Sequence, residues 1–120
     1  MTILDTVGNT PLVELTSLNN NPNVKVFAKL EGSNPGGSVK DRPALFMMRN
    51  ALKRGDITVN TKLIEATSGN TGIALALMAS LFKIKIELVM PASSTHERVL
   101  AMQAFGAEVT LLETIEECRD

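Results

Sequence analysis

Residues 34–42, with the sequence NPGGSVKDR, have the composition of a loop that presents a reactive lysine. The adjacent glycines Gly36 and Gly37 let the backbone approach a ligand closely. Lys40 falls at or just before the start of a predicted helix, where the positive end of the helix dipole disfavours an ammonium. Burial would add to this effect, and a neutral amine can attack an aldehyde. The alternative is a surface lysine in a helix-capping turn, and this segment alone leaves both interpretations open.

The same loop does not have the spacing of a phosphate-binding P-loop. A P-loop needs four residues between its first glycine and a Gly-Lys-Ser/Thr ending. Gly32 and Gly37 have that separation, but two residues then intervene before Lys40, and Asp41 follows it. The spacing therefore excludes a P-loop.

A second polar loop, residues 67–72 with the sequence TSGNTG, lies between a predicted strand and a predicted helix. Backbone N–H groups and three hydroxyls at a helix N-terminus suit an anion such as a carboxylate. A dinucleotide fingerprint needs Gly-x-Gly-x-x-Gly, and only Gly69-x-x-Gly72 is present, so a Rossmann cofactor site is weakly supported. A capped helix with permissive glycines is the alternative. Because the two loops follow successive predicted strands, a shared site explains them better than two unrelated turns.

Alternating secondary structure must position these loops. Apolar patterning predicts strands at residues 12–15, 24–30, 62–65, 85–90 and 108–112. Helical periodicity predicts helices at residues 41–54, 71–82 and about 95–105, of which the second is apolar enough to be buried on most sides. Strands separated by single helices predict an α/β fold with a parallel sheet, flanking helices and right-handed crossovers.

The ends of these helices carry recognisable signals. Gly55 and Gly106 are predicted helix stops. Pro43 is tolerated only in a first turn, so the first helix is expected to begin close to Asp41 or to be kinked there. Residues 114–117 have the spacing of a capping box that begins another helix, which predicts that the sequence is part of something longer.

The composition limits the possible functions. The 120 residues are 44% hydrophobic and 21% charged with a formal net charge of −1, which is typical of a globular domain. There is no Lys/Arg block, no Trp and no Tyr, so no nucleic-acid partner is expected. The single cysteine, Cys118, predicts a cytoplasmic protein. No signal peptide or membrane span is expected, and the lone His96 offers no metal site.

Together these segments resemble the cysteine synthases, or O-acetylserine sulfhydrylases, of the fold type II family of pyridoxal phosphate enzymes. The resemblance runs over essentially all 120 residues. It rests on the lysine motif, the carboxylate motif, the opening turn GNTPL and three shorter matches, at residues 34–42, 65–72, 8–12, 29–31, 97–98 and 105–108. Residues 35–37 and 65–67 resemble the B-type enzyme. The implied architecture is the three-layer, tryptophan synthase β-like fold, here incomplete.

The resemblance implies a role for each polar residue of the two loops. Lys40 would bind pyridoxal 5'-phosphate covalently and act as the acid and base at the substrate α-carbon, while Asn70 would hydrogen-bond the cofactor's ring hydroxyl. The substrate carboxylate would be bound by Thr67, Ser68, Gly69 and Thr71. The reaction would be a β-replacement, in which acetate leaves O-acetylserine and sulfide, or thiosulfate in the B-type, adds to form L-cysteine.

The resemblance also divides the chain. The strands within residues 1–35 would join a large cofactor domain, and residues 36–120 would form a small α/β domain, cut at its C-terminal end. The family's phosphate-binding Gly/Thr loop and the serine at the pyridine nitrogen lie further along than residue 120. These 120 residues alone are therefore expected to bind the cofactor weakly and to be inactive. A homodimer with a small amino-acid substrate is expected of the full-length protein.

Two kinds of alternative remain. Cystathionine β-synthase, threonine synthase and the serine/threonine dehydratases share a lysine loop and differ in the substrate loop. The loop at residues 67–71 favours the sulfhydrylase and cystathionine β-synthase branch. An alternative of another class is a truncated module that keeps the fold, has no catalytic activity and binds a partner.

Overall fold

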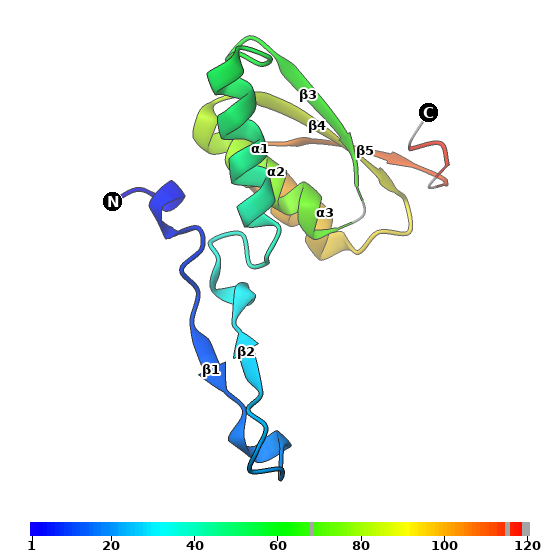
Figure 1. Cartoon of the computed structure of the whole chain (residues 1–120). Helices are drawn as coiled ribbons and strands as arrows, with labels where there is room; N and C mark the ends of the chain where they lie inside the picture. Colours follow the sequence, from blue (N-terminus) through cyan, green and yellow to red (C-terminus); the bar gives the residue numbers. More distant parts are fainter. Residues whose placement is uncertain (68, 115, 119–120) are drawn as a thin grey trace.

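The computed structural model describes residues 1–67, 69–114 and 116–118 and consists of an α/β body with an N-terminal arm (Figure 1). The arm carries the strands β1 (Leu12–Glu14) and β2 (Phe27–Lys29), with short 3₁₀ turns at Ile3–Thr6, Thr16–Leu18 and Glu31–Ser33. The body runs through α1 (Asp41–Arg54), β3 (Lys62–Ala66), α2 (Asn70–Phe82), β4 (Lys85–Pro91), α3 (His96–Ala104) and β5 (Glu108–Leu112). The predicted α/β class is confirmed.

The body is built on a parallel sheet in the order β3-β4-β5. In its register Leu63 lies opposite Ile86, and Leu88 lies opposite Val109. Both crossovers step in the same direction across the sheet, and right-handed crossovers of this kind place their helices on one face. In agreement, α2 packs against α3 and against α1. The sheet flanked by helices is therefore present, and the helices of the described residues cover one face of it.

The hydrophobic core lies between the sheet and α2. Residues 74–79 of α2 are all buried, as the apolar sequence of this helix predicts. From β4, Ile86, Leu88 and Met90 point into the same core, because alternate residues of a strand share a face. Met102 of α3 is also fully buried. This packing holds the start of α2 in a fixed place relative to the ends of the strands.

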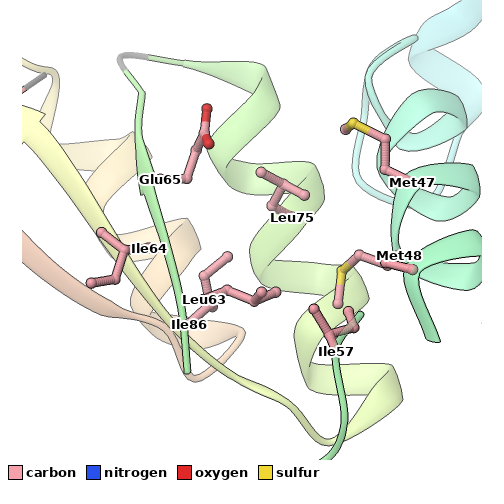
Figure 2. A pocket seen from close by; sticks show the side chains of 9 residues that line it. Met47, Met48, Ile57, Leu63, Ile64, Glu65, Leu75 and Ile86 are labelled. Carbon is pink, nitrogen blue, oxygen red and sulfur yellow. The ribbon is translucent and has the colours of Figure 1, made fainter. Parts of the chain in front are cut away.

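The opposite face of the sheet carries a three-residue ion network. Lys62 Nζ lies 2.8 Å from Glu87 Oε2 and 2.8 Å from Glu108 Oε2, and Thr110 Oγ1 donates to Glu87 Oε1 at 2.7 Å. Figure 2 shows the alternation at the β3 edge: Leu63 and Glu65 point toward the helices, whereas Ile64 points away. An open apolar groove between β3 and α1 is lined there by Met47, Met48, Ile57 and Leu75, among others.

The arm is an antiparallel hairpin that projects from the body (Figure 1). Its apolar side chains, including Leu12 and Phe27, are exposed. The second strand was predicted from residue 24, which is wrong at the start, since β2 begins at Phe27. The physical reason is local: Asn19 Nδ2 donates to Val24 O at 2.6 Å and to Asn21 O at 3.3 Å, so side-chain hydrogen bonds hold these residues in a turn.

Most predicted boundaries are confirmed. Pro43 is the third residue of α1, where the missing N–H leaves no hydrogen bond unmade. Gly55 and Gly106 have φ of 81° and 90°, the left-handed values that favour glycine after a helix. The capping-box contacts are also present, because Glu117 N donates to Thr114 Oγ1 at 3.1 Å and Thr114 N donates to Glu117 Oε2 at 3.2 Å.

The C-terminal end differs from the sequence expectation of a further helix, and α3 begins without a side-chain cap. Residues 116–118 form a turn in the described part of the chain. Thr95 occupies the N-cap position of α3 without a side-chain capping bond. Within the described ranges, the helices are all too short or too polar to cross a membrane.

Candidate active site

The lysine loop joins the arm to α1. Lys40 occupies the N-cap position of α1, with φ of −68° and ψ of −17°, and its backbone N–H donates to Ser38 Oγ at 3.1 Å. Gly37 N donates to Asn34 O at 2.9 Å, and Gly37 has a φ of 89° that only glycine adopts readily. These bonds close a tight turn immediately before the helix. The Lys40 side chain is exposed, so the burial expected around its amine is not supplied by the described residues.

Asp41 closes the same turn from inside. Its side chain is fully buried, and its Oδ2 accepts a hydrogen bond from Gly36 N. The other oxygen, Oδ1, has no partner among the described residues. Burial raises the pKa of the Asp41 carboxyl, and the hydrogen bond from Gly36 opposes that rise. A side chain at position 36 would collide with this carboxyl, which explains why a glycine stands there.

Arg42 connects the start of α1 to the arm. Its Nε donates to Glu31 Oε2 at 2.8 Å, and its Nη2 donates to Glu31 Oε1 at 3.0 Å, a bidentate arrangement. Thr10 Oγ1 donates to the same Oε1 at 2.6 Å, and Asn34 Nδ2 donates to Oε2 at 2.9 Å. The hydrogen bond from Arg42, followed by that from Thr10, lowers the pKa of Glu31 to about 2.

The predicted anion loop joins β3 to α2. Thr67 Oγ1 accepts from Gly72 N at 3.1 Å and from Gly69 N at 3.4 Å, so its hydroxyl caps the helix while its own hydrogen stays available to donate. The first-turn N–H groups of Asn70 and Thr71 have no carbonyl partner within the helix. Thr67 and Thr71 are half-buried, and Asn70 is exposed. Ser68 lies outside the described residues.

A residue of α3 completes the wall of this loop. The guanidinium of Arg98 lies so close to Gly69 that a Cβ at that position would be 3.8 Å from both Arg98 Cζ and Nη1. A guanidinium beside this loop adds to the positive potential of the α2 N-terminus. The arrangement suits a bound carboxylate.

The fold brings the two predicted loops to one end of the body. Figure 1 shows α1 and α2 starting at the same end, and the two helices pack against each other. The carboxyl ends of parallel strands form the edge at which α/β proteins bind ligands. Lys40, at the start of α1, and Asn70, at the start of α2, therefore stand at the same end of the body. The apolar groove of Figure 2 shares no residue with the two loops.

Comparisons with known proteins agree with this geometry. The chain matches the family described as "Pyridoxal-phosphate dependent enzyme" over residues 3–120. It is 55% identical to cysteine synthase B of Pseudomonas aeruginosa over 99% of the chain and 41% of that protein. It is 52% identical to cysteine synthase B of Salmonella typhimurium over 92% of the chain and 37% of that protein. The chain thus spans about two fifths of the length of these curated relatives.

Solved structures give the same result. The O-acetylserine sulfhydrylase isoform 3 of Entamoeba histolytica superposes with a TM-score of 0.92 at 38% identity, over 98% of this chain and 37% of that one. A hydrogen sulfide-producing enzyme of Fusobacterium nucleatum superposes with a TM-score of 0.89 at 44% identity, over 98% and 40%. The chain belongs to the pyridoxal-phosphate dependent enzyme family.

The residues at this end of the body fit the family's cofactor. An exposed primary amine at Lys40 can react with an aldehyde, and the Asn70 amide can hydrogen-bond a ring hydroxyl. The hydroxyls of Thr67 and Thr71 stand at a helix N-terminus, which suits the carboxylate of an amino acid. The residues present therefore offer a group for the cofactor's aldehyde, one for its ring hydroxyl and a set of donors for the substrate carboxylate.

Four residues of the site were not assigned a role from the sequence: Glu31, Asp41, Arg42 and Arg98. Glu31, Asp41 and Arg42 lie in or next to the lysine loop in the sequence, whereas Arg98 lies far from both loops. The contacts that identify them join residues 5 positions apart for Asp41 and Gly36, 11 for Arg42 and Glu31, and 29 for Arg98 and Gly69, so only the folded structure reveals them.

Proposed function

We propose that the full-length protein carries out a pyridoxal phosphate-dependent β-replacement on O-acetylserine, in which sulfide displaces acetate to give L-cysteine or thiosulfate displaces acetate to give S-sulfocysteine. The observation that carries the proposal is the placement of a reactive-lysine loop and an anion loop at adjacent helix N-termini. Curated relatives at 52–55% identity are named cysteine synthase B, which supports the same reaction and the B-type branch.

Each residue would act in a defined way. Lys40 would hold the cofactor and then move a proton at the substrate α-carbon, since a primary amine can take up and return a proton. Thr67, Ser68, Gly69 and Thr71 would bind the substrate carboxylate and orient the α-carbon toward that amine. Asn70 would donate to the cofactor's ring hydroxyl. The bound cofactor supplies an electron sink that stabilises negative charge at the α-carbon.

The exposed apolar residues of the arm support a second part of the proposal. Residues 1–35 would join the large cofactor domain, because side chains such as Leu12, Leu18 and Phe27 remain uncovered by residues of the body. Residues 36–120 would be the small domain. A cytoplasmic homodimer is the assembly that the family resemblance favours.

A related reaction is the second candidate. One similar structure is an O-acetylserine dependent cystathionine β-synthase from Helicobacter pylori, with a TM-score of 0.87 at 41% identity. Homocysteine would then replace sulfide as the nucleophile, while the carboxylate loop and Lys40 would keep their roles. Assays of the full-length protein with O-acetylserine and either sulfide, thiosulfate or homocysteine discriminate between the two, and the proposal expects product to form faster with sulfide or thiosulfate than with homocysteine.

Substitution of the lysine tests the proposal itself. Lys40→Ala in the full-length protein should lower kcat by about 10³-fold or more, because general acid–base catalysis and covalent attachment are lost together. Lys53→Ala, which removes an exposed lysine from the last turn of the same helix, is the matched control and should leave kcat unchanged. Equal activity of Lys40→Ala and Lys53→Ala would contradict the proposal.

A further inference from the structure

The two ends of the lysine loop are joined through a single carboxylate oxygen. Asn34, at the beginning of the loop, donates from Nδ2 to Glu31 Oε2 at 2.9 Å. Arg42, at the end of the loop, donates from Nε to the same oxygen at 2.8 Å. Lys40 stands between these two attachment points. The hydrogen bonds from Asn34 and Arg42 to Glu31 therefore tie together the two ends of the segment that contains Lys40.

The other groups around Glu31 hold that carboxylate in place. Its Oε1 accepts from Thr10 Oγ1 at 2.6 Å and from Arg42 Nη2 at 3.0 Å. Thr10 and Asn34 are 6% and 4% exposed, so the bonds from these two residues are shielded from water, whereas the side chains of Arg42 and Glu31 are 36% and 20% exposed. Asn34 Oδ1 in turn accepts from Gly8 N at 2.8 Å. We call Thr10, Glu31, Asn34 and Arg42 the Glu31 clamp.

The clamp also uses the geometry of arginine. Arg42 binds the carboxylate through two nitrogens, which fixes the angle between α1 and the segment after β2 as well as their separation. A Cβ at position 8 would lie 2.8 Å from Arg42 Nη1, so the glycine turn of the arm packs directly on the guanidinium. The Arg42 guanidinium is thus held on one side by the Glu31 carboxylate and on the other by the turn at Gly8.

We propose that Glu31 is a positioning residue for Lys40, acting through Asn34 and Arg42 to hold the lysine loop in its closed form. The inference rests on the proposed role of Lys40. With the clamp intact, the backbone of the lysine loop is ordered before the cofactor and the substrate bind. The Lys40 amine is therefore held in one position. When glutamine replaces Glu31, one of the two acceptor oxygens becomes an NH2 group that cannot accept, so the donors on that side lose their partner and the loop ends separate. A displacement of about 1 Å at a reacting group can cost about 100-fold in rate.

The test uses the full-length protein and two variants of the clamp. Glu31→Gln keeps the side-chain shape and removes the charge, and Arg42→Lys keeps the charge and removes the bidentate geometry. Glu14→Gln changes an exposed carboxylate of the same arm and is the matched control. Amide hydrogen exchange is measured on protein freed of pyridoxal phosphate, and the rate of cofactor reattachment is followed by absorbance. Steady-state kcat and KM for O-acetylserine are then measured.

A positioning role predicts a localised effect. In Glu31→Gln, amide exchange should accelerate within residues 34–42 and remain unchanged in β4 and α2. Cofactor reattachment and kcat should fall by about 10–100-fold, while KM for O-acetylserine changes less than about threefold, because the carboxylate loop is untouched. Arg42→Lys should change amide exchange, cofactor reattachment and kcat in the same direction but by a smaller factor. Glu14→Gln should match the wild type.

Other results overturn the inference. Unchanged exchange and reattachment in Glu31→Gln would show that the clamp does not position the loop. Faster exchange throughout β4 and α2, or failure of both clamp variants to fold, would show that the clamp serves stability alone. The proposed function fails separately: in that case the wild-type protein itself would not reattach pyridoxal phosphate, although the exchange pattern could still show that Glu31 orders the loop.

Discussion

The substitution Gly72→Ala tests how tightly the anion loop is built. Gly72 is the third residue of α2 and is buried against two other elements. A Cβ there would collide with Thr67 Cγ2 and would lie 3.2 Å from Thr67 Oγ1 and 2.8 Å from Met102 Cε. The methionine can rotate away because its end is flexible. Thr67 cannot move without giving up its hydrogen bond from Gly72 N.

The expected cost combines three effects. Overpacking of a close-packed site typically costs about 1–3 kcal/mol. The loss of the hydrogen bond between Gly72 N and Thr67 Oγ1 adds about 1 kcal/mol. Alanine is better than glycine within a helix by about 1 kcal/mol, which offsets part of this. The substitution should therefore lower the free energy of unfolding by about 1–3 kcal/mol and displace the Thr67 hydroxyl.

Urea unfolding of the full-length protein measures the loss of stability. KM for O-acetylserine measures the displacement of the Thr67 hydroxyl, which is proposed to bind the substrate carboxylate. The matched control is Gly32→Ala, because a Cβ at that position meets only Gly37 O, at 4.0 Å. The control should retain the wild-type unfolding midpoint and KM. If Gly72→Ala were as stable as Gly32→Ala and had the same KM, Thr67 would not be packed against Gly72, and the described geometry of the loop would be refuted.

Three further predictions concern other positions. Gly36→Ala should destabilise the protein by about 1–3 kcal/mol in urea unfolding, because its Cβ collides with the buried Asp41 carboxyl; wild-type stability would contradict this. Lys83→Gly should stabilise it by up to about 1 kcal/mol, since Lys83 ends α2 with a φ of 58°, and a lower unfolding midpoint would count against that conformation. The pKa of Glu31 is lowered from 4.5 to about 2, so its contribution is present above pH 4.5 and lost as the pH falls toward 2. Glu31→Gln should therefore show a shallower loss of stability than the wild type across that interval, and parallel acid-unfolding curves would refute the assignment.

The sequence predicts the body of the molecule well because its signals are local. Strand β5 has the predicted limits, residues 108–112. Polar and apolar residues alternate at its beginning, which indicates a strand, and the preceding Gly106 ends the helix before it. Helix α1 begins at Asp41 and ends before Gly55, where proline and glycine restrict the backbone. The β2 start was missed because hydrogen bonds from the Asn19 side chain compete with strand formation.

The candidate site is predictable in part. Its two loops follow from glycines, hydroxyls and a lysine that lie close together in the sequence. The contacts that shape the loops do not follow in the same way. Thr67 accepts a hydrogen bond from the Gly72 N–H, five residues later in the chain. Glu31 is hydrogen-bonded to Arg42, 11 positions away, and to Thr10, 21 positions away. Polar partners so far apart become recognisable only when the packing of the elements is known, and this is also why Arg98 was assigned no role.

The most direct test of the central claim is the identity of the lysine that holds the cofactor. The full-length protein would be incubated with pyridoxal phosphate, reduced with borohydride, digested and analysed by mass spectrometry. The proposal predicts a phosphopyridoxyl group on Lys40, at near-stoichiometric yield, and no such label on Lys53 or Lys62. A label on another lysine, or an unlabelled Lys40 in protein that has bound the cofactor, would contradict the assignment of this loop as the catalytic centre.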